Sequence, residues 1–150
     1  MIHIEISEGF RNQIESRLLT YAAETTLQHQ TSPGVDLTVV ITTDEEVHQL
    51  NHQHRGIDAP TDVLSFEAGY PDPETETIYL GDVIIAYPQA ESQAQKGGHP
   101  TEVELQLLVV HGVLHLLGHD HAEPEEKSKM WQAQGEILKK LGLDKLRLGV

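Results

Sequence analysis

The sequence predicts an α+β fold: a single domain over residues 1–150, with a roughly four-stranded mixed sheet, a buried central helix and several flanking helices. Segments with the two-residue period of strands alternate with segments that have the 3.6-residue period of helices. One helical segment is apolar around nearly its whole circumference, as expected inside a core. A chain of 150 residues can bury roughly 70% of its unfolded surface, and neither loops nor termini suggest a second domain.

Four segments are predicted to be strands because their apolar or β-branched residues alternate or run together between turn residues. They are 2–6, 35–42, 63–67 and 78–87. In the first, Ile2, Ile4 and Ile6 alternate with polar residues, which indicates one buried face. Ser32-Pro33-Gly34 breaks the chain before the second strand, and the Pro- and acid-rich segment 71–74 is predicted to be a loop that is mobile at its tip.

The helix predictions rest on capping residues and on apolar residues three or four positions apart. The helices are predicted to begin near Ser7, Thr43, Pro88, Thr101 and Pro124. The first is expected to run continuously through Ala22. Thr43 and Thr101 are each followed three residues later by a glutamate, which is the capping-box pattern. The segment 105–117 is the nearly all-apolar one, and we expect it in the middle of the core.

Composition limits the chemistry that is available. The chain has no cysteine, so a thiolate zinc site and a disulfide framework are both excluded. The segment Met1 to Ser7 lacks the basic flank and apolar run of a signal peptide, and the most apolar segment is too short to span a bilayer. The sequence therefore predicts a cytoplasmic protein without a membrane partner.

Charge argues against a broad nucleic-acid-binding surface. The formal net charge is −14, from 24 acidic and 10 basic side chains, whereas phosphate contacts depend on Lys and Arg. Before Lys127 the basic side chains are Arg11, Arg17, Arg55 and Lys96. Any basic residue at an active site is therefore one of very few.

Three histidines have the spacing of a metal site. His111 and His115 stand four residues apart on the buried helix, so their rings leave the same face. Gly118 can adopt the left-handed conformation that ends a helix, and the returning chain can then bring His121 to the same ion. We predict that these three imidazoles hold one zinc ion, which makes the core helix a metal-binding helix. Three protein ligands leave a coordination position for water, as in catalytic sites.

The alternative to metal binding is that these histidines are ordinary core residues, and the spacing of the other histidines is less distinctive. A single histidine on an apolar helix is more often a core residue than a ligand, but burying two imidazoles is costly unless each finds a partner. His48 and His52 form a second pair four residues apart, and we interpret them as part of a solvated helix face. His119 and Asp120 lie between the turn and His121, where either side chain could orient a ligand.

The spacing H-x-x-x-H-x-x-G-x-x-H is also that of metzincin peptidases. In those enzymes the residue after the first histidine is the glutamate that acts as general base, whereas this chain has Gly112. Peptide hydrolysis must protonate a leaving amine, but a phosphodiester mainly needs its charge neutralised. Gly112 therefore favours a phosphodiester substrate, with close backbone packing or substrate approach as its local reason.

The chain resembles the YbeY family of bacterial endoribonucleases. The likeness rests on the histidine motif 111–121, on Asn51 to Arg55 with the segment 61–66, and on Gly81-Asp82-Val83-Ile84-Ile85. It implies zinc at the three histidines and an important arginine at Arg55. It also implies action on single-stranded RNA in ribosomal RNA maturation, including the 3′ end of small-subunit rRNA, and in ribosome quality control.

Two positions depart from the family pattern, since the family commonly has tyrosine where this chain has His54 and His119. Arg55 is the candidate to hold phosphate oxygens, and its alternative role is a surface salt bridge. Asp82 is interpreted as structural rather than as a partner of a ligand. Because the chain is acidic, we expect recognition of RNA to need a ribosome or ribosomal proteins, and we expect no DNA substrate.

Three other functions stay open on the sequence. The first is a metallopeptidase-like hydrolase, which the ligand spacing permits. The second is a non-catalytic, zinc-stabilised ribosome-associated module. The third is a hydrolase of small molecules. The native metal could also be another borderline divalent ion instead of zinc.

Overall fold

The computed structural model describes residues 1–32, 34–71, 77–120 and 122–143, whose four strands form one sheet in the order β1-β2-β4-β3. The strands are β1 (Ile2–Ile6), β2 (Val35–Thr42), β3 (Val63–Pro71) and β4 (Ile78–Ala86). β1, β2 and β4 run parallel, and β3 pairs antiparallel with β4. The predicted four-stranded mixed sheet is confirmed. The predicted loop 71–74 is wrong at its first residue, because Pro71 pairs with Ile78 and ends β3. Pro33 of the predicted turn and residues 72–74 of that loop lie outside the described residues.

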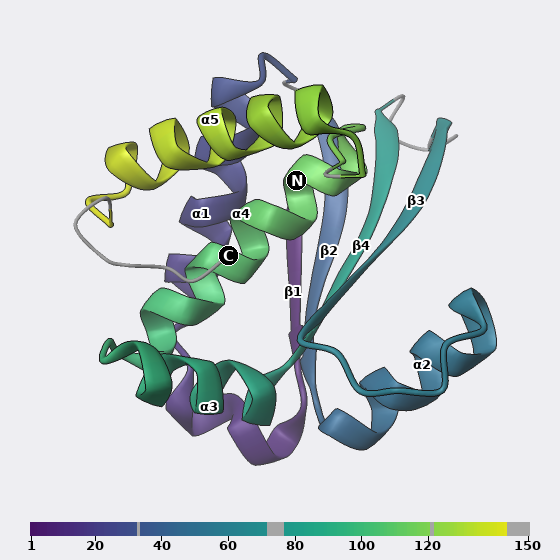
Figure 1. The fold of residues 1–150 in the computed structure, drawn as a ribbon, viewed down its shortest axis with the longest axis vertical. Coiled ribbons are helices and arrows are strands. Elements are labelled where there is room, and N and C mark those ends of the chain that lie inside the picture. The colour runs from purple at the N-terminus through teal and green to yellow at the C-terminus, as the bar shows by residue number, and fades with distance from the viewer. Residues whose placement is uncertain (33, 72–76, 121, 144–150) are drawn as a thin grey trace.

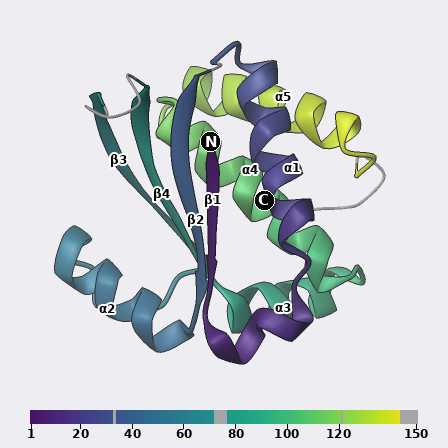
Figure 2. The ribbon, with the colours of Figure 1, turned by 180° about the vertical axis from the view of Figure 1, so that it is seen from behind.

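Helices cover both faces of this sheet. They are the 3-10 helix η1 (Glu8–Gln13) and the α-helices α1 (Ser16–His29), α2 (Asp44–Arg55), α3 (Tyr87–Gly97), α4 (Thr101–Leu116) and α5 (Pro124–Lys140). In Figures 1 and 2, α1, α3, α4 and α5 lie on one side of the sheet and α2 lies on the other. The α+β class is therefore confirmed, with a large core under α4 and a smaller one under α2.

The α4 helix lies in the middle of the larger core, as its apolar sequence predicts. Its residues from Glu104 to Val110 are all buried, and so are those from Gly112 to Leu114. His111 and His115 are half-buried, because their side of the helix borders a cavity described below. The core therefore fixes the helix rigidly and leaves its two histidines accessible.

The first predicted helix is wrong in one respect, because it is not continuous. Ile14 is extended, with φ −124° and ψ 130°, and separates η1 from α1. Phe10 stacks on Tyr87 with ring centroids 4.6 Å apart, which holds η1 against the start of α3. The Ser7 hydroxyl donates to Thr42 Oγ1 over 3.1 Å instead of capping a helix. Contacts with distant elements therefore override the local helical pattern.

The two predicted capping boxes also differ from expectation. Thr43 caps α2 by accepting a hydrogen bond from the Glu46 amide, but the Glu46 carboxylate accepts from Thr42. At α4 the N-cap residue is Pro100, which has no polar side chain, so Thr101 is already inside the helix and the first turn has no side-chain cap. The Glu104 carboxylate is buried and pairs with His99 Nε2 at 2.7 Å. A buried carboxylate needs such a partner, so Glu104 is not available to the helix end.

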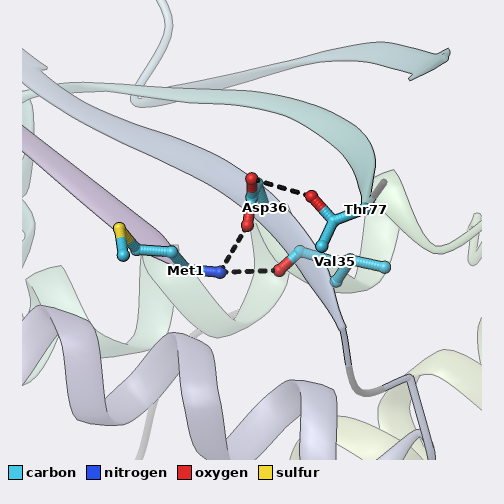
Figure 3. Close-up of polar contacts among 4 residues, drawn as sticks. All are labelled: Met1, Val35, Asp36 and Thr77. Atoms are coloured by element: carbon cyan, nitrogen blue, oxygen red, sulfur yellow. Dashed lines mark hydrogen bonds and ion pairs between the residues drawn. The ribbon is translucent and has the colours of Figure 1, made fainter. Parts of the chain in front are cut away.

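A polar cluster joins the ends of three strands. The amino group of Met1 donates to the Asp36 carboxylate over 2.6 Å and to the Val35 carbonyl over 3.0 Å, and the Thr77 hydroxyl donates to the other Asp36 oxygen (Figure 3). These contacts hold β1 and the start of β4 on either side of β2. Among the described residues, no helix is long and apolar enough to cross a membrane.

Candidate metal centre

His111 and His115 bring two ring nitrogens together on one face of α4. Their Nε2 atoms lie 3.2 Å apart, and their ring centroids lie 4.7 Å apart. Two nitrogens bound to one tetrahedral zinc ion at 2.0–2.1 Å are separated by about 3.4 Å. The pair is therefore spaced as two ligands of one ion, and neutral imidazole is a donor that suits zinc.

A buried amide holds the His111 ring in place. Gln134 of α5 is 4% exposed, and its Oε1 lies 3.0 Å from His111 Nδ1. Because an amide oxygen can only accept, this contact places the ring proton on Nδ1 and leaves the Nε2 lone pair directed towards His115. In proteins, a hydrogen bond from the second ring nitrogen orients a metal-bound histidine in the same way. The residues present therefore fit a metal ion at this position.

The predicted turn after α4 is confirmed. Gly118 has φ 98°, and its amide donates to the His115 carbonyl while the amide of His119 donates to the Leu114 carbonyl. This pair of bonds is the Schellman motif that ends helices and turns the chain back. His121 lies outside the described residues, and within them no group of three or more metal-ligating side chains could hold an ion.

The two histidines line a cavity of about 650 Å³ that also includes Arg55. It lies at the outer edge of β3, between the end of α2 and the end of α4. Asn51 contributes from α2, and its side-chain amide donates to the Ala59 carbonyl over 2.9 Å, which fixes the connection from α2 to β3. Three of the four predicted site residues therefore share one cavity.

Arg55 reaches over the edge strand. Its Nη2 donates to the Ser65 carbonyl over 2.6 Å, and its guanidinium carbon lies 5.8 Å from the centroid of the Phe66 ring. Among the described residues Arg55 has no carboxylate within ion-pair distance, so the alternative of a surface salt bridge is not observed. The remaining guanidinium donors can serve a ligand in the cavity.

Gly112 allows the helix to touch the sheet. A Cβ atom at this position would lie 2.5 Å from Val83 Cγ1 and 3.3 Å from Ser65 Oγ. Of the two reasons that the sequence left open, close packing accounts for this glycine. The same contact leaves no space for the glutamate found here in metzincins, which disfavours the peptidase alternative.

His119 is held by a chain of hydrogen bonds that leads away from the cavity. Its Nε2 contacts Gln30 Oε1 at 2.8 Å, Gln30 Nε2 contacts His29 Nδ1 at 2.9 Å, and His29 Nε2 contacts Glu136 at 3.1 Å. Partial burial of the His119 ring lowers its pKa, and the nearby His29 and Lys129 add to the effect. His119 lines the cavity, but its hydrogen bond joins it to Gln30 at the end of α1 rather than to a predicted ligand.

The other polar residues have structural contacts. The Tyr79 hydroxyl donates to the Asp82 carboxylate, in agreement with the structural interpretation of Asp82. His48 contacts Asp58 at 2.7 Å on the surface, and His52 is exposed, so the solvated face predicted for that pair is confirmed. Asp120 is exposed and lines the cavity.

Sequence reasoning missed Gln134 and the Gln30 to Glu136 chain. Gln134 could have been found from the sequence, because it lies four residues after Met130 on the apolar face of α5. A polar side chain on such a face needs a buried partner. Gln30 and His29 gave no such signal, since their partners are more than 80 residues away along the chain.

Known proteins resemble this chain over nearly its whole length. The chain matches the family described as Endoribonuclease YbeY over residues 3–142. A relative of that name from Shouchella clausii is 42% identical over 140 residues, which cover 87% of this chain and 86% of the relative. One from Roseiflexus sp. is 39% identical over 151 residues, covering 96% and 94%. The solution structure of TM1509 from Thermotoga maritima matches with a TM-score of 0.58 and 30% identity, over 95% of this chain and 92% of that one.

Proposed function

This chain belongs to the Endoribonuclease YbeY family, and from this we propose that it is an endoribonuclease that cleaves single-stranded RNA during ribosomal RNA maturation. We place its action at the 3′ end of small-subunit rRNA and in ribosome quality control. The observation that carries the proposal is the meeting of His111, His115 and Arg55 in one cavity. That arrangement sets metal ligands beside a cation that can hold phosphate.

Zinc is the metal that we propose, held by His111, His115 and His121. The support for two ligands is the 3.2 Å spacing of their Nε2 atoms and the Gln134 contact that directs His111. The support for His121 is the left-handed turn at Gly118 that follows them. A bound zinc ion supplies hydroxide near neutral pH and Lewis acidity toward a phosphoryl oxygen.

Arg55 has the role of binding the phosphate in this proposal. Its contact with the Ser65 carbonyl uses one guanidinium nitrogen and orients the planar fork along the cavity wall. The fork can then donate to two non-bridging oxygens, whose charge grows during cleavage. Phe66 beneath the guanidinium restricts its movement, so the donors are oriented before the substrate arrives.

The position of the cavity supports a single-stranded substrate. The two histidines lie on a helix behind the edge strand rather than on a flat surface. A nucleic acid must therefore turn individual nucleotides toward the two histidines. Unpaired RNA can do this, whereas a continuous duplex cannot. We also expect DNA of the same sequence to stay uncut, with the 2′-hydroxyl as the group by which the site recognises RNA.

Charge determines the partner in this proposal. With a net charge of −14, the chain repels the phosphate backbone outside the immediate site. We therefore propose that the ribosome or ribosomal proteins present the RNA, and that the enzyme acts in the cytoplasm. A tight, sequence-specific complex between the isolated protein and naked RNA would contradict this part.

A cleavage assay with matched nucleic acids tests the proposed function. The substrate is an end-labelled single-stranded RNA with the sequence around the 3′ end of small-subunit rRNA, and the controls are its duplex and the DNA of the same sequence. We expect cleavage of the single-stranded RNA only, loss on chelation and recovery with zinc. Cleavage that persists in His111→Ala and His115→Ala at the wild-type rate would reject the proposal.

A further inference from the structure

A second, smaller hollow lies beside the candidate metal centre. Its volume is about 320 Å³, and it is lined by His54, Arg55, Ser65, Phe66 and Glu67. Arg55 and Ser65 line both this hollow and the larger cavity. The two spaces therefore meet at the guanidinium group.

We propose that this hollow is a nucleobase subsite, in which a base stacks on His54 while its own phosphate, or the next one, is held by Arg55. The inference rests on the proposed function, because it names the part of an RNA substrate that this region binds. It adds a residue outside the metal ligands, His54, as a determinant of substrate affinity.

The aromatic part of the hollow is preformed. The His54 ring packs edge-on against Phe66, with centroids 5.2 Å apart and an interplanar angle of 62°. Phe66 is itself half-buried against the small core under α2. His54 is exposed on the last turn of α2, so a ring fixed by Phe66 still presents a surface to solvent. A fixed, exposed aromatic ring is the platform on which unpaired bases stack.

The backbone beneath Phe66 is also fixed. Gly81 of β4 has φ 144°, and a Cβ there would overlap the Phe66 carbonyl oxygen. The two strands therefore approach closely at this point, next to the irregularity in β3 that follows Glu67. Phe66, which supports the His54 ring, is thus part of the sheet rather than of a loop.

Charge determines which part of a nucleotide enters the hollow. Glu67 is exposed on its rim and has no hydrogen-bond partner among the residues described. A carboxylate repels phosphate but accepts hydrogen bonds from the amino groups of adenine, cytosine and guanine. Uracil carries no amino group, and its one ring N–H lies between two carbonyl oxygens that a carboxylate repels. We therefore infer that the base points toward Glu67, the phosphate toward Arg55, and that uracil is the least favoured base.

Variants of His54 test the stacking role. His54→Ala should raise KM for single-stranded RNA about fivefold or more, in line with the loss of one base–aromatic stack, with kcat and zinc content unchanged. His54→Phe keeps a stacking surface and should stay within about twofold of wild type. His52→Ala is the matched control, because this residue lies on the same helix, is exposed and lines neither cavity. Equal KM values for His54→Ala and wild type would overturn the subsite.

An abasic scan along the RNA locates the base. One abasic position should raise KM in the wild type and have a much smaller effect in His54→Ala, because the stack is already lost and only the contact with Glu67 remains to be removed. At that position, RNA with uridine should have the highest KM of the four bases. Glu67→Gln should reduce the difference in KM between uridine and the other bases. If abasic effects add to that of His54→Ala at every position, the subsite is wrong while the endoribonuclease stands. If the wild type cleaves no RNA, either alone or with ribosomal subunits added, both fail.

Discussion

The Ser65 hydroxyl donates a hydrogen bond over 3.0 Å to the carbonyl oxygen of Gly112. This contact ties the edge strand β3 to the helix that carries His111 and His115. The Ser65 carbonyl accepts from Arg55 at the same time, so one residue links the predicted phosphate-binding side chain to the predicted metal-binding helix. The relative position of the two halves of the site is therefore set by packing between β3 and α4.

Gly112→Ala tests that packing. The added Cβ would lie 2.5 Å from Val83 Cγ1, and overpacking of this kind costs about 1–3 kcal/mol of unfolding free energy. The substitution should cost less in a Val83→Ala background, where the clash is removed. Gly135→Ala in α5 is the control, because nothing lies within 4 Å of its new Cβ, and it should stabilise the protein by up to about 1 kcal/mol. Urea unfolding should be measured for five proteins: the wild type, the two single glycine variants, Val83→Ala and the Gly112→Ala/Val83→Ala double variant. An equal gain in stability from both glycine substitutions would contradict the account.

Gln134→Met tests the contact that directs His111. Methionine fills a similar volume but provides no comparable acceptor for His111 Nδ1, so zinc affinity should fall roughly 10- to 100-fold. Competition with a chromophoric chelator measures this affinity. Gln132→Met changes an exposed residue of the same helix and should leave it unaltered. Unchanged affinity in Gln134→Met would show that the amide does not orient the ligand.

Arg55 should affect cleavage without affecting the metal. Arg55→Ala is expected to lower kcat/KM for RNA by about 100-fold or more, and Arg55→Lys should recover only part of this because lysine lacks the planar fork. Zinc content should equal that of wild type in both. Arg17→Ala, which removes one positive charge from an exposed pair with Glu15, controls for net charge. A comparable loss in Arg17→Ala would mean that overall charge, not the position of Arg55, matters.

His119 should make the metal-free protein less stable in mild acid. Because burial lowers its pKa in the folded state, the unfolded chain binds the proton first as pH falls through about 6.5. Stability is therefore greatest above that pH and declines below it, until the folded protein is protonated as well. The free energy of unfolding, measured in chelator between about pH 7.5 and 5.5, should fall less steeply in His119→Gln.

The control for that series is His52→Gln, which removes an exposed imidazole from the same chain. Asp36 and Asp58 have lowered pKa values, so they titrate below about pH 5.5 and do not contribute to the slope of stability with pH in this series. An identical slope in His119→Gln and wild type would remove His119 from the explanation.

The sequence predicted those features that local patterns determine. Alternation predicted β1, β-branched residues predicted β2, and the apolar segment 105–117 predicted that α4 lies in the core, where its histidines border a cavity. It failed where partners are distant in the chain. Phe10 stacks on Tyr87 and interrupts a helix that periodicity predicts, and Glu104 pairs with His99 instead of capping. The subsite at His54 depends on Phe66 across the sheet edge, which no spacing rule reveals.

Metal stoichiometry tests the central claim, that three imidazoles converge on one ion. Zinc per chain should be measured by elemental analysis in the wild type, in His111→Ala, His115→Ala and His121→Ala, and in His52→Ala as control. We predict about one zinc ion per chain in the wild type and control, and strong loss in each of the three variants. Full zinc content in any of those three, or none in a wild type that still cleaves RNA, would contradict the account.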